Sequence, residues 1–449
     1  MSPDRAYQKT IDYLYALQKH GIKLALSNSI ALMARMDDPH RKFRSVHVAG
    51  TNGKGSTWSF LAAMLQAAGY RVGLYTSPHL VSFCERIRIN NELISEEKVV
   101  ELAARVRDAS QKTAGHEGTA ALNPTFFEVA TAMAFTYFAE EGVDIAVIEV
   151  GMGGRLDSTN VVDPLVSVIT NIELEHTEFL GTTLVQIARE KAGIIKTGIP
   201  VVTGAVQREV VAVFEEEAAA QKTAIYRLHR DFMPARIITN REQVFDYNGI
   251  ASLYEKVRLT MLGRHQVDNA CLALAAIECL RNADVAVDEA AARHGLLHAR
   301  WEGRLELVAR KPDIYLDGAH NPASAQTLAK TVRDMKSRYQ RIVLVIGILG
   351  DKDYQGIISA LVPLADRVVV TKPLYSRAMD VQALASEIRK LHGSVETAET
   401  VEDALTMAVK AVSPDDLVLI TGSLYVVGDA RALFRPESGN AGALAGLKG

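Results

Sequence analysis

The segment Gly50–Ser56, which reads GTNGKGS, has the residue types of a phosphate-binding loop but not the common spacing. The common loop has a glycine five residues before the glycine of its Gly-Lys pair and a serine or threonine directly after the lysine. Here Val48 takes the first position, and Gly55 separates Lys54 from Ser56. Backbone N–H groups at the start of a helix would bind a polyphosphate, with Lys54 near the β/γ phosphates and the hydroxyl of Ser56 or Thr57 on a phosphate or magnesium. The alternative is a glycine-rich turn with a chance lysine, and the strand and helix patterns flanking the loop favour the nucleotide site.

Several further polar side chains follow predicted strands. Glu149 stands at the end of VDIAVIEV and precedes the glycine-rich stretch GMGGRLDSTN. Because ligands bind at the carboxyl ends of strands in open α/β sheets, a metal-binding or catalytic carboxylate is favoured here over a capping or salt-bridged one. His176, after PLVSVITNI, is equally consistent with a surface imidazole and with a ligand. Ser77 and His79 in TSPHL indicate, by themselves, a turn with a helix cap.

Three other candidates are ambiguous from their residues alone. Lys191, in REKAGIIK, has the sequence context of a solvated lysine that pairs with Glu190 or another acid on its helix. Asp317 and His320, in DGAHNP, mark a polar cluster at the end of a later strand. Arg304 is as consistent with a linker salt bridge as with a group that reaches nucleotide phosphates.

Alternating strand and helix patterns must position these side chains. The segments SVHVAG, RVGLYTS, VDIAVIEV and PLVSVITNI are dense in β-branched residues and are separated by helical patterns such as FFEVATAMAFTYFAEEG and TTLVQIAREKAGI. This alternation predicts an α/β fold with a mainly parallel, doubly wound sheet in an N-terminal phosphate-loop domain. Shorter, alternating runs in residues 225–260 (AIYRL, ARIIT, QVFDYNG, KVRLTML) predict an antiparallel edge or a small β subdomain.

A second series of strands begins after an Arg- and His-rich stretch. DIYLDGAH, RIVLVIGIL, RVVVTKP and DLVLITGS are each followed by an amphipathic helical pattern. This series predicts a smaller Rossmann-like α/β domain. We therefore expect an N-terminal domain over residues 1–298 and a C-terminal domain over residues 299–449.

Composition excludes several classes of protein. The chain has 449 residues and a formal net charge of −3, without long single-sign runs, which argues against a nucleic-acid or anionic-membrane surface. Its cysteines, Cys84, Cys271 and Cys279, follow no paired spacing, so no disulfide framework or zinc site is expected. Neither a signal-peptide pattern nor an uninterrupted apolar run of about 18 residues occurs. We expect a cytoplasmic protein whose partners are small molecules.

Taken together, these residues resemble those of one family, the folylpolyglutamate synthase/dihydrofolate synthase group of the Mur ligase superfamily of ATP-dependent amide-bond ligases. The motifs that carry the resemblance cover most of the chain: GTNGKGS (50–56), TSPHL (76–80), TFFE (125–128), EVGMGGRLDSTN (149–160), ITNIELEHTEFLG (169–181), REKAGI (189–194), EGRLE (302–306) and LDGAHNP (316–322). They run in the order expected for the family. The inserted Gly55 is typical of its folate branch, so the irregular loop resembles this superfamily's form of the phosphate-binding loop.

The resemblance implies that MgATP binds between the two domains. Matching residue by residue, the ATP contacts would be Gly53, Lys54, Gly55, Ser56, Asn269, Arg304 and Asp317, and the magnesium ligands Ser77, Glu149, His176 and Lys191. Lys191 matches a lysine that the family carries as a carbamate, which reverses its interpretation as a solvated cation. A carbamate would offer anionic oxygens to hard magnesium ions. Two magnesium sites and a monomeric protein are also implied, and a monovalent cation is allowed as a further cofactor.

The implied reaction proceeds through an acyl phosphate. A substrate carboxylate attacks the γ-phosphate of ATP, and the amine of L-glutamate then displaces phosphate. The residues implied in catalysis are Lys54, Lys191, His176 and Arg304. Thr125, Phe126, Phe127, Glu128 and Leu156 match positions on the pterin side of the pocket, and His320 and Ser423 match positions on the glutamate side.

One departure from the family bears on the acceptor substrate. Near the N-terminus the family often shows a Gly-Leu-x-Arg pattern that helps to hold the pterin, whereas this chain reads KLALSN, with Ser27 near the expected arginine. The pterin contacts of residues 24–26 are therefore open, as is the choice between dihydropteroate, folates that already carry glutamate, or both. The length of the chain and the TFFE match favour both.

Three other functions compete with this interpretation. A cell-wall ligase of the same superfamily would need an N-terminal domain for a nucleotide-linked sugar, and only about 45 residues precede the loop. A nucleotide-dependent regulatory protein would hydrolyse ATP without a pterin or glutamate. A catalytically silent binding protein is disfavoured because every expected metal-ligand position is retained.

Overall fold

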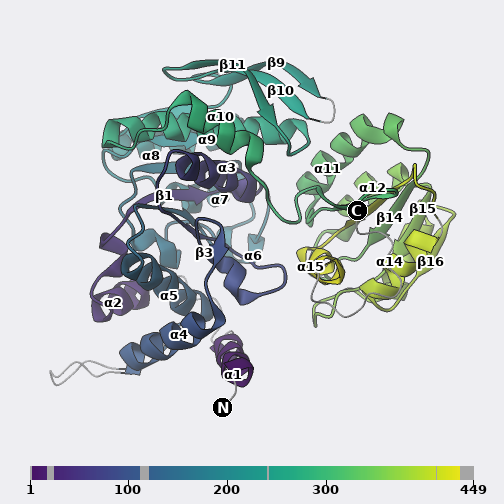
Figure 1. Cartoon of the computed structure of the whole chain (residues 1–449), viewed down its shortest axis with the longest axis horizontal. Coiled ribbons are helices and arrows are strands. Elements are labelled where there is room, and N and C mark those ends of the chain that lie inside the picture. The colour runs from purple at the N-terminus through teal and green to yellow at the C-terminus, as the bar shows by residue number, and fades with distance from the viewer. Residues whose placement is uncertain (1–2, 18–24, 112–120, 240–241, 411, 435–449) are drawn as a thin grey trace. The chain divides into compact units, whose positions relative to one another are not determined.

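The computed structural model describes residues 3–17, 25–111, 121–239, 242–410 and 412–434 (Figure 1). The chain divides into two compact units, one containing residues 1–260 and 266–299 and the other containing residues 261–265 and 300–449. The first unit thus ends next to the predicted boundary between residues 298 and 299. The second unit also includes residues 261–265, which the sequence assigned to the N-terminal domain.

The first unit is built on an eight-stranded sheet in the order β4-β3-β2-β5-β1-β6-β7-β8. Its strands are β1 (Arg44–Ala49), β2 (Val72–Tyr75), β3 (Ile87–Ile89), β4 (Glu92–Leu93), β5 (Ile145–Glu149), β6 (Val166–Ile169), β7 (Val201–Thr203) and β8 (Ile225–Arg227). In this spatial order, each strand from β2 through β5, β1, β6 and β7 to β8 pairs in parallel with the next. At the other edge, β3 pairs antiparallel with β2, and β4 pairs antiparallel with β3. The central strand β1 lies between β5 and β6, so the ends of these three strands meet beside the Gly-rich loop.

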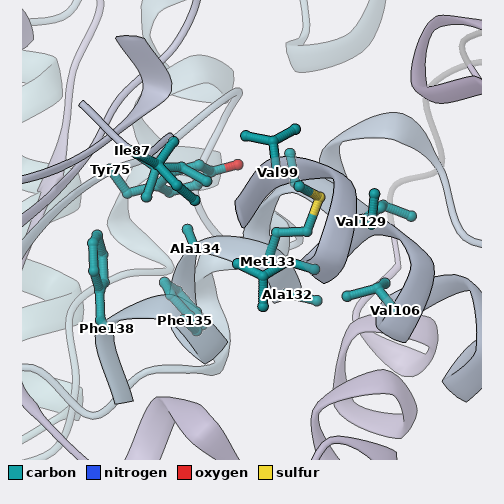
Figure 2. Close-up of a cluster of buried hydrophobic side chains, with 14 of the residues drawn as sticks. Tyr75, Ile87, Val99, Val106, Val129, Ala132, Met133, Ala134, Phe135 and Phe138 are labelled. Atoms are coloured by element: carbon teal, nitrogen blue, oxygen red, sulfur yellow. The ribbon is translucent and has the colours of Figure 1, made fainter. Parts of the chain in front are cut away.

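Helices cover both faces of this sheet. Those of the first unit are α1 (Pro3–Ala16), α2 (Ser27–Arg35), α3 (Lys54–Ala67), α4 (Glu96–Gln111), α5 (Phe126–Glu140), α6 (Thr177–Leu180), α7 (Leu184–Ala192), α8 (Arg208–Ala220), α9 (Arg264–Leu280) and α10 (Glu289–His298). The first two residues of α9 belong to the second unit, and the rest of the helix, from Gln266, belongs to the first. One core joins α4 and α5 to β2 and β5, and Figure 2 shows Val99, Met133, Phe135 and Phe138 of these helices near Tyr75 of β2. A second core joins α7 and α8 to β6 and β7.

A small antiparallel sheet follows the main sheet in the chain. It consists of β9 (Met233–Thr239), β10 (Gln243–Asn248) and β11 (Leu253–Leu259), in the order β11-β10-β9, and β11 contacts α10. The predicted small β subdomain is therefore present. One of its predicted members is wrong, because Ile225–Arg227 pairs in parallel with β7 as the last strand of the main sheet. This strand follows α8, and a strand–helix–strand crossover returns the chain parallel to its predecessor.

The second unit contains a six-stranded sheet in the order β12-β13-β17-β14-β15-β16. Its strands are β12 (Glu306–Ala309), β13 (Asp313–Leu316), β14 (Ile342–Ile346), β15 (Arg367–Val370), β16 (Val395–Thr397) and β17 (Leu417–Thr421), and its helices α11 (Pro322–Met335), α12 (Tyr354–Leu361), α13 (Val381–Arg389), α14 (Val401–Lys410) and α15 (Leu424–Leu433). Among the described strands of this sheet, only β12 runs antiparallel to its neighbour. The predicted α/β class is confirmed for both parts. Among the described helices none is long and apolar enough to cross a membrane.

Candidate active site

The Gly-rich loop connects β1 to α3 and is held by the residues that follow the neighbouring strand β6. The carbonyl oxygen of Asn171 accepts from Thr51 N at 2.9 Å, and its side-chain Oδ1 accepts from Asn52 N at 2.7 Å. Gly53 adopts φ +86° at the start of α3, a conformation that glycine reaches without strain. A Cβ at Gly53 would also lie 2.6 Å from Oδ1 of Asn269, so the predicted ATP contact on α9 is next to the loop.

Two lysine side chains converge on one carbonyl group of this loop. Lys54 Nζ donates to the carbonyl oxygen of Gly50 at 2.9 Å and to that of Thr51 at 3.0 Å. Lys191 Nζ, from α7, donates to the same Gly50 oxygen at 3.0 Å. The structure thus brings together two of the predicted catalytic residues, which come from distant parts of the sequence.

Lys191 is buried, with 6% of its surface exposed. Burial and, after it, the charge of Lys54 lower the pKa of its amine to about 7, and Glu175 and Asp157 partly oppose the shift. The interpretation of Lys191 as a solvated lysine paired with Glu190 is wrong, because Lys191 is buried and Glu190 instead pairs with Arg155 at 2.9 Å. A buried lysine with a lowered pKa is neutral in a large fraction of molecules near neutral pH, and the neutral amine is nucleophilic.

The stretch GMGGRLDSTN packs directly against the backbone that carries Lys191. A Cβ at Gly154 would lie 2.8 Å from the carbonyl oxygen of Glu190 and 3.0 Å from that of Lys191, so only glycine permits this approach. Asp157 closes the same loop by accepting from Met152 N at 2.9 Å. Burial raises the pKa of the Asp157 carboxyl, and its hydrogen bonds to Thr159 and Met152 oppose that rise.

Two of the predicted magnesium ligands meet at the ends of β2 and β5. Glu149 is buried, and its Oε2 accepts from Ser77 N at 2.8 Å. His176 follows β6 and is exposed, with a left-handed backbone (φ 51°) before α6. In the part of the chain that the structure describes, no three His, Cys, Asp or Glu side chains form a metal-binding group. The predicted set contains only Glu149 and His176 of those types, so a magnesium site would also need oxygens from Ser77 and from a modified Lys191.

The predicted pterin-side residues begin helix α5. Thr125 and Glu128 form a capping box, in which Glu128 Oε2 accepts from Thr125 N at 2.6 Å and Thr125 Oγ1 accepts from Glu128 N at 3.3 Å. Phe126 stacks on Tyr15, with ring centroids 5.8 Å apart. These contacts give Thr125, Phe126 and Glu128 structural roles, while their predicted substrate contacts stay predictions.

The remaining positions on this side lie close by in the fold. Phe127 fills the space beside Gly151, where a Cβ would approach its ring to 2.4 Å, and Leu156 is partly buried in the same glycine-rich stretch. Of the doubtful segment 24–26, residue 24 lies outside the described residues, and residues 25 and 26 directly precede α2.

The second unit holds the other predicted residues, at the carboxyl ends of β13 and β17. Asp317 accepts from Leu305 N and from Ala319 N, each at 2.9 Å. Burial raises the pKa of the Asp317 carboxyl, and the positive charge of nearby Arg304 opposes that rise. The predicted ATP contacts Arg304 and Asp317 are thus neighbours. His320 and Ser423 follow the same two strands, and Ser423 is a buried helix cap that accepts from Tyr425 N at 3.1 Å.

Comparison with known proteins agrees with this geometry. The family described as "Mur ligase middle domain" matches residues 48–277, and that described as "Mur ligase, glutamate ligase domain" matches residues 303–424. A dihydrofolate synthase/folylpolyglutamate synthase of Bacillus subtilis is 41% identical over 437 residues, covering 95% of this chain and 98% of that protein. The chain belongs to the folylpolyglutamate synthase/dihydrofolate synthase family.

Solved structures of this family have the same fold. The Mycobacterium tuberculosis folylpolyglutamate synthase complexed with ADP superposes with a TM-score of 0.89 at 36% identity, covering 97% of this chain and all of that one. Escherichia coli FolC in complex with DHPP and ADP superposes with a TM-score of 0.83 at 30% identity, covering 94% and 97%. The predicted family is therefore confirmed.

Two structural features were missed in the sequence. Asn171, which holds the loop backbone, lies inside the quoted motif ITNIELEH directly after a strand. Because β6 neighbours β1, the rule that ligands lie at strand ends would have pointed to it. The second is a contact group in the second unit, formed by Tyr375, Arg377 and Tyr425; Tyr425 lies two residues after the matched Ser423, but Tyr375 and Arg377 lie in a segment without a motif from the resemblance.

Proposed function

We propose that this protein joins L-glutamate to a folate-type carboxylic acid at the expense of ATP, through an acyl-phosphate intermediate. The observation that carries the proposal is the convergence of Lys54 and buried Lys191 on the Gly50 carbonyl, within a loop that opens helix α3. Such a loop offers backbone N–H groups and the helix dipole to a polyphosphate. Lys54, now bound to loop carbonyls, would exchange them for phosphate oxygens when ATP binds.

In the first step an oxygen of the acceptor carboxylate forms a bond to the γ-phosphorus, and the bond to ADP breaks. Negative charge gathers on the transferred group, so Lys54 and Arg304 would stabilise it electrostatically. In the second step the amine of L-glutamate attacks the acyl carbon, phosphate leaves and the amine loses a proton. The resulting bond is an amide, which places the enzyme among the ATP-dependent acid–amino-acid ligases.

We further propose that Lys191 is carbamylated. The neutral amine would add to carbon dioxide, forming an N–C bond and releasing one proton, which converts a cation into an anion. The lowered pKa of Lys191, caused first by burial and then by the Lys54 charge, supports this step near neutral pH. The charge reversal would also replace the repulsion between Lys54 and Lys191 with attraction.

The donor set fits magnesium once Lys191 is a carbamate. Ser77, Glu149 and the carbamate oxygens would hold the ion, with His176 as a nitrogen ligand. An ammonium at position 191 would instead repel it. Bound magnesium would supply charge neutralisation for the phosphates. The number of sites and the monovalent cation stay predictions, as do the monomeric state and the cytoplasmic location.

The acceptor is proposed to be both dihydropteroate and reduced folates. The Bacillus subtilis relative carries both synthase names, and one E. coli relative was solved with DHPP. The first turn of α5, with Thr125 to Glu128, is retained and ordered here. This supports a pterin-side pocket in spite of the altered segment before α2.

The test is ATP-dependent incorporation of labelled L-glutamate, run with dihydropteroate and, separately, with tetrahydrofolate monoglutamate. Products with both acceptors are expected. Product with only one would reduce the proposal to that single synthase activity. ATP hydrolysis without any glutamate product would instead favour the regulatory ATPase, and product only with another amino acid or acceptor would favour a different ligase of the superfamily.

A further inference from the structure

Two tyrosine rings join separate loops at the carboxyl edge of the second sheet. Tyr375 lies in the loop after β15, and Tyr425 lies in the first turn of α15, after β17. Their rings stack with centroids 4.0 Å apart and planes 12° apart. Tyr425 is two residues beyond Ser423, so the stack adjoins a position matched to the glutamate side. Ligands of open α/β sheets bind along this edge.

The stack supports an arginine. The guanidinium of Arg377 lies over the Tyr375 ring at 5.2 Å from the centroid, and its Nη1 is 3.2 Å from Asp351 Oδ2. The backbone of the arginine is held as well, because its carbonyl oxygen accepts from Gly350 N at 2.8 Å. Residues from the ends of β14, β15 and β17 therefore fix one side chain that stays 53% exposed.

Stability alone explains this arrangement poorly. An exposed Arg–Asp pair contributes little, typically about 0 to 1 kcal/mol. A guanidinium carries five N–H donors in a planar fork; here Nη1 donates to Asp351, and the Tyr375 and Tyr425 hydroxyls also interact with the guanidinium. An arginine held over an aromatic ring loses little further entropy when it binds a planar carboxylate with two parallel hydrogen bonds. The neighbouring Tyr425 hydroxyl is protonated at neutral pH and can donate, and burial raises its pKa further, to about 12.

We propose that Arg377, held by Tyr375, Tyr425 and Asp351, binds one carboxylate of the incoming L-glutamate. This inference rests on the proposed function, because glutamate is the substrate that carries two carboxylates beside the reacting amine. Arg377 would then set specificity for an acidic amino acid, and Tyr375 and Tyr425 would be positioning residues.

The test compares steady-state kinetics of the full-length protein with those of Arg377→Ala and Arg377→Lys. We expect the KM for L-glutamate to rise about tenfold to a hundredfold in Arg377→Ala, the loss typical of a charged hydrogen-bonded pair. The KM for ATP should stay unchanged, and Arg377→Lys should recover part of the loss because it keeps the charge. Arg389→Ala removes an exposed arginine from the last turn of α13 and is the matched control, with an unchanged KM for glutamate expected.

If Arg377 had a purely structural role, its replacement would impair the acyl-phosphate step and glutamate ligation alike. The acyl-phosphate step needs no glutamate, so acceptor-dependent positional isotope exchange in ATP should persist in Arg377→Ala. An unchanged KM for glutamate in Arg377→Ala, or equal loss of isotope exchange and ligation, would overturn the inference. Failure of the proposed function would show differently, as absence of glutamate ligation in the unmodified protein.

Discussion

Lys54 and Lys191 donate to the same carbonyl oxygen, that of Gly50, at 2.9 and 3.0 Å. Two ammonium groups on one acceptor repel each other, and Lys191 is the more buried of the two. Burial and, after it, the Lys54 charge lower the pKa of Lys191 to about 7, so its amine loses its proton near neutral pH. In the proposed function, Lys54 is the cation for phosphates and Lys191 the amine that reacts with carbon dioxide.

Replacing Lys191 by alanine should remove most ligase activity and leave ATP binding largely intact. The variant keeps Lys54 and the loop backbone but lacks the proposed carbamate oxygens for magnesium. Turnover of glutamate and ATP affinity, measured by calorimetry, check this expectation. Arg189→Ala is the control, because Arg189 lies on the same helix but is exposed and pairs with Glu216.

Added short carboxylic acids such as acetate should restore part of the activity of Lys191→Ala, because they can supply the missing oxygens. They should not affect the unmodified protein. Near-normal turnover of Lys191→Ala without any additive would mean that the carbamate is not required.

Lys191 should also make stability depend on pH. Its pKa is about 7 in the folded protein against an ordinary value of 10.5, so between these values the unfolded chain binds a proton that the folded protein lacks. The free energy of unfolding contributed by this group therefore rises with pH across that window, by at most about 1.4 kcal/mol per pH unit. Below pH 7 both states are protonated, and the full cost of burying the charge remains.

Urea denaturation of the unmodified protein and of Lys191→Met, in buffers free of bicarbonate, measures this contribution. Methionine has no titrating group, so the difference in unfolding free energy between the two proteins should shift in favour of the lysine as pH rises from neutral. A difference that is constant with pH, or that shifts the other way, would show that Lys191 titrates normally.

The sequence predicted features that depend on local pattern. The strand, loop and helix around Gly53 were predicted, as was the position of Glu149 at a strand end, because strand and helix periodicities are local. The burial of Lys191 was not predicted, because Glu190 is next to it in the sequence and is a possible ion-pair partner. In the folded protein Glu190 pairs with Arg155 instead. The resemblance to a family, and not the residues, suggested its special role.

Long-range pairing explains the other misses. The local sequence of Ile225–Arg227 does not show whether this strand belongs to the edge of the main sheet or to the small antiparallel sheet. Arg377 likewise has the context of a surface turn, and its support comes from Tyr425, which the sequence places in another strand–helix unit. Contacts of this kind are decided by which strands become neighbours.

Gly154→Ala should destabilise the protein and disturb the site together. The added Cβ would lie 2.8 Å from the carbonyl oxygen of Glu190, which is backbone and cannot rotate away. We expect a loss of about 1 to 3 kcal/mol in unfolding free energy, as for overpacked interiors. Gly393→Ala is the matched control, since a Cβ there has no described atom within 4 Å. Equal stability of the two variants in urea would contradict the close approach of this loop to α7.

Thr125→Ala should separate the capping role of Thr125 from its predicted contact with the acceptor. Loss of the Oγ1 bond to Glu128 N removes an N-cap, which costs about 1 kcal/mol, whereas Thr125→Ser keeps the hydroxyl and should remain near normal. Because Phe126 and Phe127 occupy the helix turn that this cap fixes, the KM for the pterin-containing acceptor should rise in Thr125→Ala with the KM for ATP unchanged. Thermal unfolding and acceptor kinetics of both variants check the two effects. A raised KM in Thr125→Ser with normal stability would show that the methyl group contacts the acceptor directly, and normal stability of Thr125→Ala would show that the cap contributes nothing.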